Sequence, residues 1–206
     1  MSLSLPDILV DLSHWQVAPN FAAMKAAGVA AVIVKATQGV TMVDPTFPVR
    51  SMAAARAGLL VGAYHFCDAS PPVRQVEHFL SVAGHLLVLS IDIEPNGIGD
   101  TVTVAQAAEI AARLHQATGR LPLVYIGRWG PAGNGAGLPN KVLARCPLWL
   151  AEYGTDPVCP AGWDDAWTFW QYTDAGVVPG VAEPCDCSRF TRTTPQELSA
   201  WWNSGV

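Results

Sequence analysis

Two acidic side chains, Asp92 and Glu94, follow an apolar run and form the clearest chemical pattern in the sequence. The run is Leu86–Ile91, and Pro95 ends the segment. Residues two apart in an extended segment point to the same face, which predicts Cβ atoms roughly 6.5–7 Å apart. Carboxyl groups that close disfavour joint ionisation, so at least one pKa should rise toward the range that a general acid needs. The pair therefore predicts glycosidic-bond hydrolysis, with a loop ion pair, a helix cap or metal binding as alternatives.

Two further aspartates lie at the ends of candidate strands. Asp11 ends the segment that starts at Ile8, and Asp186 begins the last candidate strand. If the strands close into a barrel, the first and last are neighbours, so both acids could reach one cleft with the Asp92 pair. Taken singly, each is more typical of a turn or a cap, and their shared geometry is what favours function.

The elements that must position these acids alternate along the chain. Several apolar runs are continuous, as expected for strands buried on both faces. The predicted strands are Ile8–Leu12, Ala31–Ala36, Leu59–Phe66, Leu86–Ile93, Leu121–Ile126, Leu148–Tyr153, Trp167–Tyr172 and Cys185–Phe190. Eight strands that alternate with helices predict a mostly parallel sheet closed into a barrel, whose active site forms at the carboxyl ends of the strands.

Helices are predicted mainly in the first half of the chain. The predicted segments are Phe21–Ala27, Pro48–Ala57, Val73–Val82, Val102–Ala117 and a last amphipathic helix, Thr194–Trp202. Glycines follow three of these segments as C-terminal stops, and Thr103 with Gln106 forms a candidate capping box. The Gly- and Pro-rich stretch 127–140 and the lack of clear helices between the last strands predict an irregular barrel with eroded helices in the C-terminal half.

Composition limits the class of protein. The 206 residues fit one domain, half of them are hydrophobic, and the net charge of −5 argues against a nucleic-acid partner. No apolar run is long enough to span a membrane. The N-terminus lacks a signal peptide, so we expect either synthesis in a cytoplasm or an export signal outside this chain.

The five cysteines do not indicate a metal centre. An odd count without regular spacing is a poor disulfide framework, although a Cys146–Cys159 bridge remains open. The Cys185-x-Cys187 pair lacks a second pair to complete a zinc site. We therefore expect neither a metal nor a cofactor.

Six ordered segments resemble the family 25 glycoside hydrolases, the Chalaropsis-type lysozymes. The segments are Asp11-Leu12-Ser13-His14-Trp15-Gln16, Val32–Gly39, Gly62–Phe66, Ile91–Glu94, Leu148–Tyr153 and Trp170–Thr173. Any one of them is weak, whereas the ordered set from residue 11 to about 190 is specific. The resemblance implies a flattened, TIM-like barrel and an N-acetylmuramidase that cuts peptidoglycan.

Carried over position by position, the resemblance assigns roles to the acids. Glu94 resembles the general acid/base, and Asp92 resembles the residue that orients the substrate's N-acetyl group for neighbouring-group attack. Asp11 and Asp186 resemble the remaining carboxylates of the groove. The resemblance implies substrate-binding positions at Tyr64, Trp149, Tyr153 and Gln171. Tyr125 and Trp15 are substrate-binding candidates from the residues alone.

Two departures from the family pattern are visible. Gln38 stands where the second motif usually has glutamate, and Ser188 stands where the last motif usually has asparagine. Neither touches the Asp92/Glu94 pair, so they put groove details in doubt and leave the reaction unaffected. Of the other polar residues, we expect Lys35, His14 and His65 to be structural.

Aromatic residues divide into core and groove candidates. We expect Trp163, Trp167, Trp201 and Trp202 to pack in the core, and we keep Trp129 with Trp15 and Trp149 as groove candidates. The expected protein is a monomeric lysozyme acting on peptidoglycan strands of the bacterial cell wall, either a phage endolysin or a secreted enzyme. The alternatives are a glycosidase acting on chitin and a non-catalytic glycan-binding module.

Overall fold

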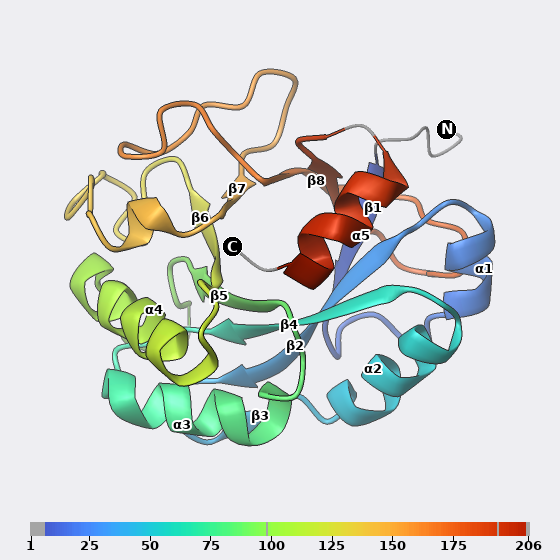
Figure 1. Cartoon of the computed structure of the whole chain (residues 1–206), viewed down its shortest axis with the longest axis horizontal. Helices are drawn as coiled ribbons and strands as arrows, with labels where there is room; N and C mark the ends of the chain where they lie inside the picture. The colour runs from blue at the N-terminus through green and yellow to red at the C-terminus, as the bar shows by residue number, and fades with distance from the viewer. Residues whose placement is uncertain (1–6, 98, 193, 205–206) are drawn as a thin grey trace.

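Eight strands close into a barrel in the computed structural model, which describes residues 7–97, 99–192 and 194–204 (Figure 1). The barrel strands are β1 (Asp7–Leu12), β2 (Ala31–Gln38), β4 (Leu60–Phe66), β5 (Leu89–Ile93), β6 (Leu123–Gly127), β7 (Leu148–Ala151), β8 (Phe169–Gly176) and β9 (Cys185–Phe190). Their order is β1-β9-β8-β7-β6-β5-β4-β2, and pairing between β1 and β2 closes the ring. The barrel expected from the sequence is thus confirmed.

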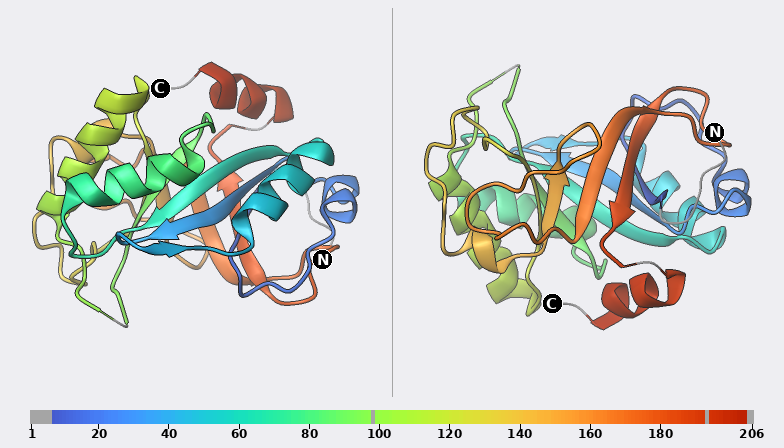
Figure 2. Two further views of the ribbon diagram at one scale, coloured as in Figure 1. Left: turned by 90° about the horizontal axis from the view of Figure 1, so that it is seen from below. Right: turned by 90° about the horizontal axis from the view of Figure 1, so that it is seen from above.

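Strand direction differs from a regular barrel at one position. The neighbouring pairs from β1 through β2, β4, β5, β6 and β7 to β8 are parallel, while β9 runs antiparallel to both β8 and β1 (Figure 2). A short strand, β3 (Met42–Val43), forms a hairpin with the end of β2 and was not predicted. The antiparallel β9 matters for the site, because its first residues lie at the carboxyl ends of the parallel strands.

Alternation along the strands separates two apolar layers. The barrel interior holds Leu9, Ala31, Ile33, Val88, Leu123, Tyr125, Trp149, Phe169 and Phe190. Residues one position away, such as Val10, Val32 and Val124, belong to a second cluster shared with the helices outside. This period of two is the geometry of a strand whose two faces are both buried.

Helices cover the first half of the barrel (Figure 1). They are α1 (Phe21–Ala26), α2 (Phe47–Arg56), α3 (Pro72–Ala83) and α4 (Val104–Thr118), close to the predicted segments. The capping box predicted at Thr103 is present, with the Thr103 side chain accepting from the Gln106 backbone. Between β6 and β9 the described chain has only the short 3-10 helix η1 (Leu143–Arg145), which confirms the eroded second half.

The predicted strand Leu86–Ile93 starts three residues too early, and the strands predicted from Leu121 and Trp167 start two residues too early. The segment Leu86–Val88 lies outside β5, because α3 continues to Ala83 and the chain then turns before entering the sheet. Leu87 is exposed in this connection. An apolar run of this length does not by itself mark where the hydrogen-bonded ladder begins.

The last helix, α5 (Pro195–Ser204), closes the amino-terminal end of the barrel. Leu198 and Trp202 are buried in the interior cluster with Leu9 and Phe169, as the sequence predicted. Trp201 is half-buried and its ring meets Phe169 edge-on. The opposite end of the barrel is therefore the open one. The carboxyl ends of the parallel strands and their polar residues lie there.

Candidate active site

Four carboxyl groups meet in one cleft at the carboxyl end of the barrel. Asp11 lies near the end of β1, Asp92 and Glu94 at the end of β5, and Asp186 near the start of β9. Asp11 and Asp186 are direct partners in the β1–β9 ladder, because β9 is antiparallel. The expectation that the first and last strands bring these two acids together is confirmed.

The cleft has a volume of about 160 Å³ and is built almost entirely from predicted residues. Its walls are Asp11, Tyr64, Asp92, Glu94, Tyr125, Trp149, Tyr153, Gln171 and Asp186. They come from seven strands and the segments that follow them, each reached by the alternation that puts every second residue inside. The geometry therefore gathers nine side chains that are up to 175 positions apart in sequence (186 − 11 = 175).

Asp92 is the buried member of the central pair. It is 6% exposed, and its Oδ1 atom has no hydrogen-bond partner among the described residues. Burial and then the charge of Glu94 raise the pKa of Asp92 well above its ordinary value, while Lys35 opposes the shift. A buried carboxylate oxygen without a hydrogen-bond donor destabilises the folded state. Such an oxygen can accept a hydrogen bond from a bound molecule.

Glu94 lies one step further out, just beyond the end of β5. Burial raises the pKa of Glu94, Lys35 lowers it and Asp186 raises it, with a net upward shift. A carboxyl group that keeps its proton at higher pH and still reaches a cleft can act as a general acid. The two members of the pair thus differ in exposure and share one cavity.

Asp11 belongs to a hydrogen-bonded chain across the cleft floor. Gln171 Nε2 donates to Asp11 Oδ2 at 3.0 Å, and the Tyr125 hydroxyl donates to Gln171 Oε1 at 2.9 Å. Burial and then the charge of Asp186 raise the pKa of Asp11 well above its ordinary value. Burial also raises the pKa of Asp186, which the hydrogen bond from Asp11 lowers in part. This arrangement fixes the amide of Gln171 with its nitrogen toward the acids.

Aromatic rings form the rest of the wall. Trp149 is 2% exposed, meets Tyr125 edge-on at 4.9 Å, and donates through Nε1 to Ser188 Oγ at 3.0 Å. Ser188, which stands where the family pattern usually has asparagine, therefore holds the Trp149 ring in place by accepting this hydrogen bond. Burial, followed by the charge of Asp92, raises the pKa of Tyr64 and of Tyr125, so both hydroxyls remain donors. Tyr153 is exposed at the rim.

A second hollow adjoins this cleft on the β5–β7 side. It has a volume of about 350 Å³ and shares Glu94, Tyr125 and Tyr153 with the first. Its other walls are Ile93, Pro95, Gly127, Gly130, Ala151 and Glu152. The sequence did not predict these residues as site residues, although their positions at or just after the ends of strands β5, β6 and β7 could have suggested most of them. Together the two hollows make a groove with Glu94 between them.

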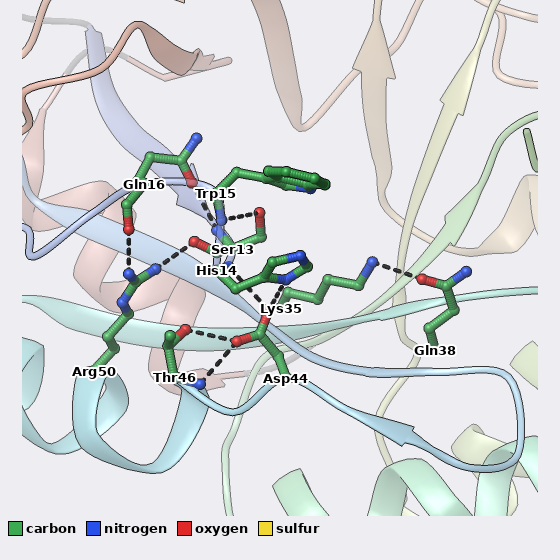
Figure 3. Close-up of polar contacts among 9 residues, drawn as sticks. All are labelled: Ser13, His14, Trp15, Gln16, Lys35, Gln38, Asp44, Thr46 and Arg50. Atoms are coloured by element: carbon green, nitrogen blue, oxygen red, sulfur yellow. Dashed lines mark hydrogen bonds and ion pairs between the residues drawn. The ribbon is translucent and has the colours of Figure 1, made fainter. Parts of the chain in front are cut away.

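Trp15 is the one predicted site residue that does not line the cleft. It lies in the loop after β1, 75% exposed, with its ring beside that of His14 (Figure 3). The loop is held from below, because Arg50 donates to the carbonyl oxygens of Ser13 and Gln16. Trp129 is also exposed, on the loop after β6. Both rings remain candidates for substrate contact outside the cleft.

The two histidines near the strand ends are held in structural networks. His14 Nδ1 lies 2.9 Å from the buried carboxylate of Asp44 (Figure 3). His65 contacts Thr37 at 2.7 Å and Gln75 at 3.1 Å on the outer side of the barrel, and burial lowers the pKa of His65 to about 4. Neither histidine is a wall of the cleft.

The described residues contain no group of three or more His, Cys, Asp or Glu side chains arranged to hold a metal ion. The five cysteines are free thiols, and the Cys146–Cys159 bridge left open by the sequence is not formed. Among the described helices, none has the length and apolar character needed to cross a membrane.

Comparisons with known proteins agree with this geometry. The sequence model of glycosyl hydrolases family 25 matches residues 10–181. Lysozyme M1 of Streptomyces globisporus is 31% identical over 92% of this chain and 69% of its own length. The N,O-diacetylmuramidase of Chalaropsis is 30% identical over 80% of this chain and 87% of its own length.

Solved structures extend the likeness to three dimensions. The bacterial lysozyme from Streptomyces coelicolor superposes with a TM-score of 0.87 at 30% identity, covering 99% of this chain and 100% of that one. The family 25 lysozyme from Aspergillus fumigatus superposes with a TM-score of 0.76 at 31% identity, covering 92% and 96%. The likeness thus spans the barrel and the segments that carry the acids.

Proposed function

The chain belongs to glycosyl hydrolases family 25, and we propose that it is a muramidase cutting peptidoglycan between N-acetylmuramic acid and N-acetylglucosamine. The observation that carries the proposal is the unpartnered Asp92 Oδ1 buried beside Glu94 in one cleft. An N-acetyl sugar offers the amide hydrogen that such an acceptor lacks. The relatives named lysozyme and muramidase support the same substrate class.

Glu94 is the proposed general acid. Its raised pKa keeps a proton available, and its place between the two hollows puts it beside a bond that bridges them. It protonates the glycosidic oxygen as the bond breaks and later takes a proton from the water that completes hydrolysis. The two sugars on either side of the bond then occupy the two hollows.

Asp92 is the proposed partner for the acetamido group. Its Oδ1 accepts the N–H hydrogen bond and so aims the acetamido oxygen at the anomeric carbon, while the negative charge stabilises the positive charge that develops there. The acetamido oxygen bonds to that carbon as the leaving sugar departs. Water then opens the cyclic intermediate from the other face, so the configuration is retained.

The remaining wall residues hold the sugar and the charges. Asp11 donates a hydrogen bond to Asp186, and Gln171 holds Asp11 in place through the hydrogen bond that it donates. Tyr64 donates through a hydroxyl that stays protonated, and the Tyr125 hydroxyl, which donates to Gln171, can accept from the sugar. Trp149 with Tyr153 presents apolar ring surface to the sugar. Trp15, outside the cleft, extends the surface available to a longer glycan strand.

The proposal concerns a single catalytic unit over residues 1–206 that works as a monomer on the bacterial cell wall. The family match over residues 10–181 and the closed barrel support one unit. No metal or cofactor takes part in the proposed steps, which use carboxyl groups and the substrate's own acetamide.

The Glu94→Gln variant tests the proposal. With the acid removed, release of glycan fragments from purified peptidoglycan should fall by about 10²–10⁴-fold. Mass spectrometry of the products should find N-acetylmuramic acid at the new reducing ends in the wild type. Glu109→Gln, on the exposed face of α4, is the matched control and should keep full activity.

Three outcomes would contradict the proposal. Undiminished digestion by Glu94→Gln would remove the acid assignment. Release from chitin and not from peptidoglycan would change the substrate to another N-acetylhexosamine polymer. Binding of the wild type to peptidoglycan without any new reducing ends would make the protein a glycan-binding module.

A further inference from the structure

Lys35 lies on the inner face of the barrel, among the acids. Ala31 and Ile33 of β2 belong to the interior cluster, and Lys35 follows them at the next inward position. In the ladder it pairs with Tyr64, a wall of the cleft. Arg189, the other Lys or Arg in a described strand, lies over the outward-facing ring of Trp170. Within the described strands, Lys35 is thus the basic residue on the inner face.

The hydrogen-bond partner of Lys35 is neutral. Its Nζ donates to Gln38 Oε1 at 2.8 Å (Figure 3). The same nitrogen lies 4.9 Å from the centre of the Phe66 ring. The side chain is 8% exposed, and no described carboxylate lies within 4.0 Å of its nitrogen. Gln38 and the Phe66 ring therefore hold the ammonium group of Lys35 without neutralising its positive charge.

Acids at longer range complete the surroundings of the ammonium group. Burial lowers the pKa of Lys35, while Asp92, Asp44 and Glu94, in that order of strength, favour the charged form. Asp44 already accepts hydrogen bonds from the backbone and side chains of His14 and Thr46. Asp92 Oδ1, by contrast, has no hydrogen-bond partner among the described residues, so the charge of Lys35 is the interaction that favours the ionised form of Asp92.

The effect is mutual, because Lys35 lowers the pKa of both Asp92 and Glu94. The other titratable groups around this pair and Lys35 come from all neighbouring elements: Asp11 of β1, His14 and Asp44 of the adjoining loops, Tyr64 of β4, His65 on the outer side of β4, Cys67 after β4, Tyr125 of β6, Glu152 and Tyr153 after β7, and Asp186 of β9. Among these groups the acids and tyrosines add negative charge when they ionise. Lys35 is the group that lowers the pKa of Asp92 and of Glu94.

We propose that Lys35 is a positioning residue whose ammonium group, held by neutral Gln38, sets the pH range in which Asp92 is ionised while Glu94 keeps its proton. The proposal rests on the proposed muramidase mechanism. Gln38 is part of the device, because a carboxylate at that position would pair with Lys35 and cancel its charge at the cleft. The residue at position 38 thus affects the pKa of Asp92 and of Glu94 without contacting substrate.

The test is the pH profile of kcat/KM on soluble peptidoglycan fragments. Lys35→Met should move both limbs of the profile to higher pH by about one unit, since both acids lose a favourable charge. Lys35→Arg keeps the charge and should leave the limbs near those of the wild type. Gln38→Glu should shift both limbs upward, whereas Gln38→Met, which adds no charge, should not.

The outcomes separate this proposal from the proposed function. Activity that falls equally at every pH in Lys35→Met, with both limbs unmoved, would make Lys35 a structural residue and overturn the proposal. If Lys35→Met does not fold, Gln38→Glu carries the test, and unmoved limbs there overturn it equally. A wild type that releases no N-acetylmuramic acid ends would instead refute the proposed function.

Discussion

The carboxyl groups of Asp11, Asp92, Glu94 and Asp186 work against folding at neutral pH. Burial raises the pKa of each above its ordinary value, so the folded protein binds protons more tightly than the unfolded chain does. Their contribution to stability is full below the unfolded values of about 4 and is lost as pH rises through the folded values. Asp44 has the opposite sign, since hydrogen bonds outweigh burial and lower its pKa. The four cleft acids should therefore contribute more stability as pH falls, whereas His65, whose pKa is lowered to about 4, should contribute less below its unfolded value of about 6.5.

Asp92→Asn should separate activity from stability. The amide removes the unpartnered charge beside Glu94, so Tm at pH 7 should rise by roughly 2–4 °C, the shift that about 1 kcal/mol produces in a chain of this size. Glycan hydrolysis should fall by about 10²-fold or more, because the acetamido group is no longer aligned. Scanning calorimetry at pH 7 and pH 5 measures the first effect and fragment release the second.

A matched control is Asp156→Asn, which removes an exposed carboxylate outside the cleft. It should change neither quantity. A lower Tm for Asp92→Asn at pH 7 would mean that Asp92 stabilises the fold. This would contradict the destabilisation that we expect from its buried charge.

At the scale of elements, helix ends position the segments around the cleft. Helix α4 begins directly after the connection that follows Glu94, and its start is fixed by the capping box between Thr103 and Gln106. The Gln106 amide also donates to the Ala69 carbonyl, which ties the helix start to the segment after β4. One end of α4 thus joins two of the connections at the active end of the barrel.

Thr103→Ala should lower the free energy of unfolding by about 1 kcal/mol, because the backbone N–H of Gln106 loses its acceptor. Equilibrium urea unfolding measures this change, and Thr103→Ser should restore nearly all of it. Activity at 25 °C should stay close to that of the wild type, since Thr103 lies outside the cleft. An equal loss of stability in Thr103→Ser would exclude capping as the cause.

At the scale of the whole molecule, the barrel is plugged at one end and open at the other. Trp202 of α5 fills the amino-terminal end against Gly62, where an added Cβ would approach the ring to 3.2 Å. Arg120 donates to the Trp202 carbonyl and holds the helix in place. The interior next to α5 is apolar, and the polar side chains that line the cleft lie at the opposite end.

Trp202→Ala should cost about 3–5 kcal/mol of stability, because the large cavity left in the interior cannot collapse around Gly62 and Phe169. Tm should fall by roughly 10 °C, as followed by far-UV circular dichroism. Trp15→Ala removes an equally large ring from the surface and should leave Tm unchanged. A comparable loss of Tm in both variants would argue against α5 as the plug.

Much of this could be predicted from the sequence, since strand and helix patterns are local. The buried strands, the capping box at Thr103 and the same-facing Asp92 and Glu94 depend on periods of two and 3.6 and on residues within a few positions. The ordered segments that resemble family 25 likewise indicated the cleft walls, and nine of the ten predicted site residues do line the cleft. Their roles in the reaction remain predictions.

Other features depended on how distant elements meet. The antiparallel direction of β9, which pairs Asp186 with Asp11, follows from barrel closure across 175 residues and not from any local pattern (186 − 11 = 175). The neutral partner of Lys35, the unpartnered oxygen of Asp92 and the exposure of Trp15 depend on the same packing. Local sequence determines which side chains face inward, while tertiary structure decides which of them share a cavity, because burial and charge interactions act through space.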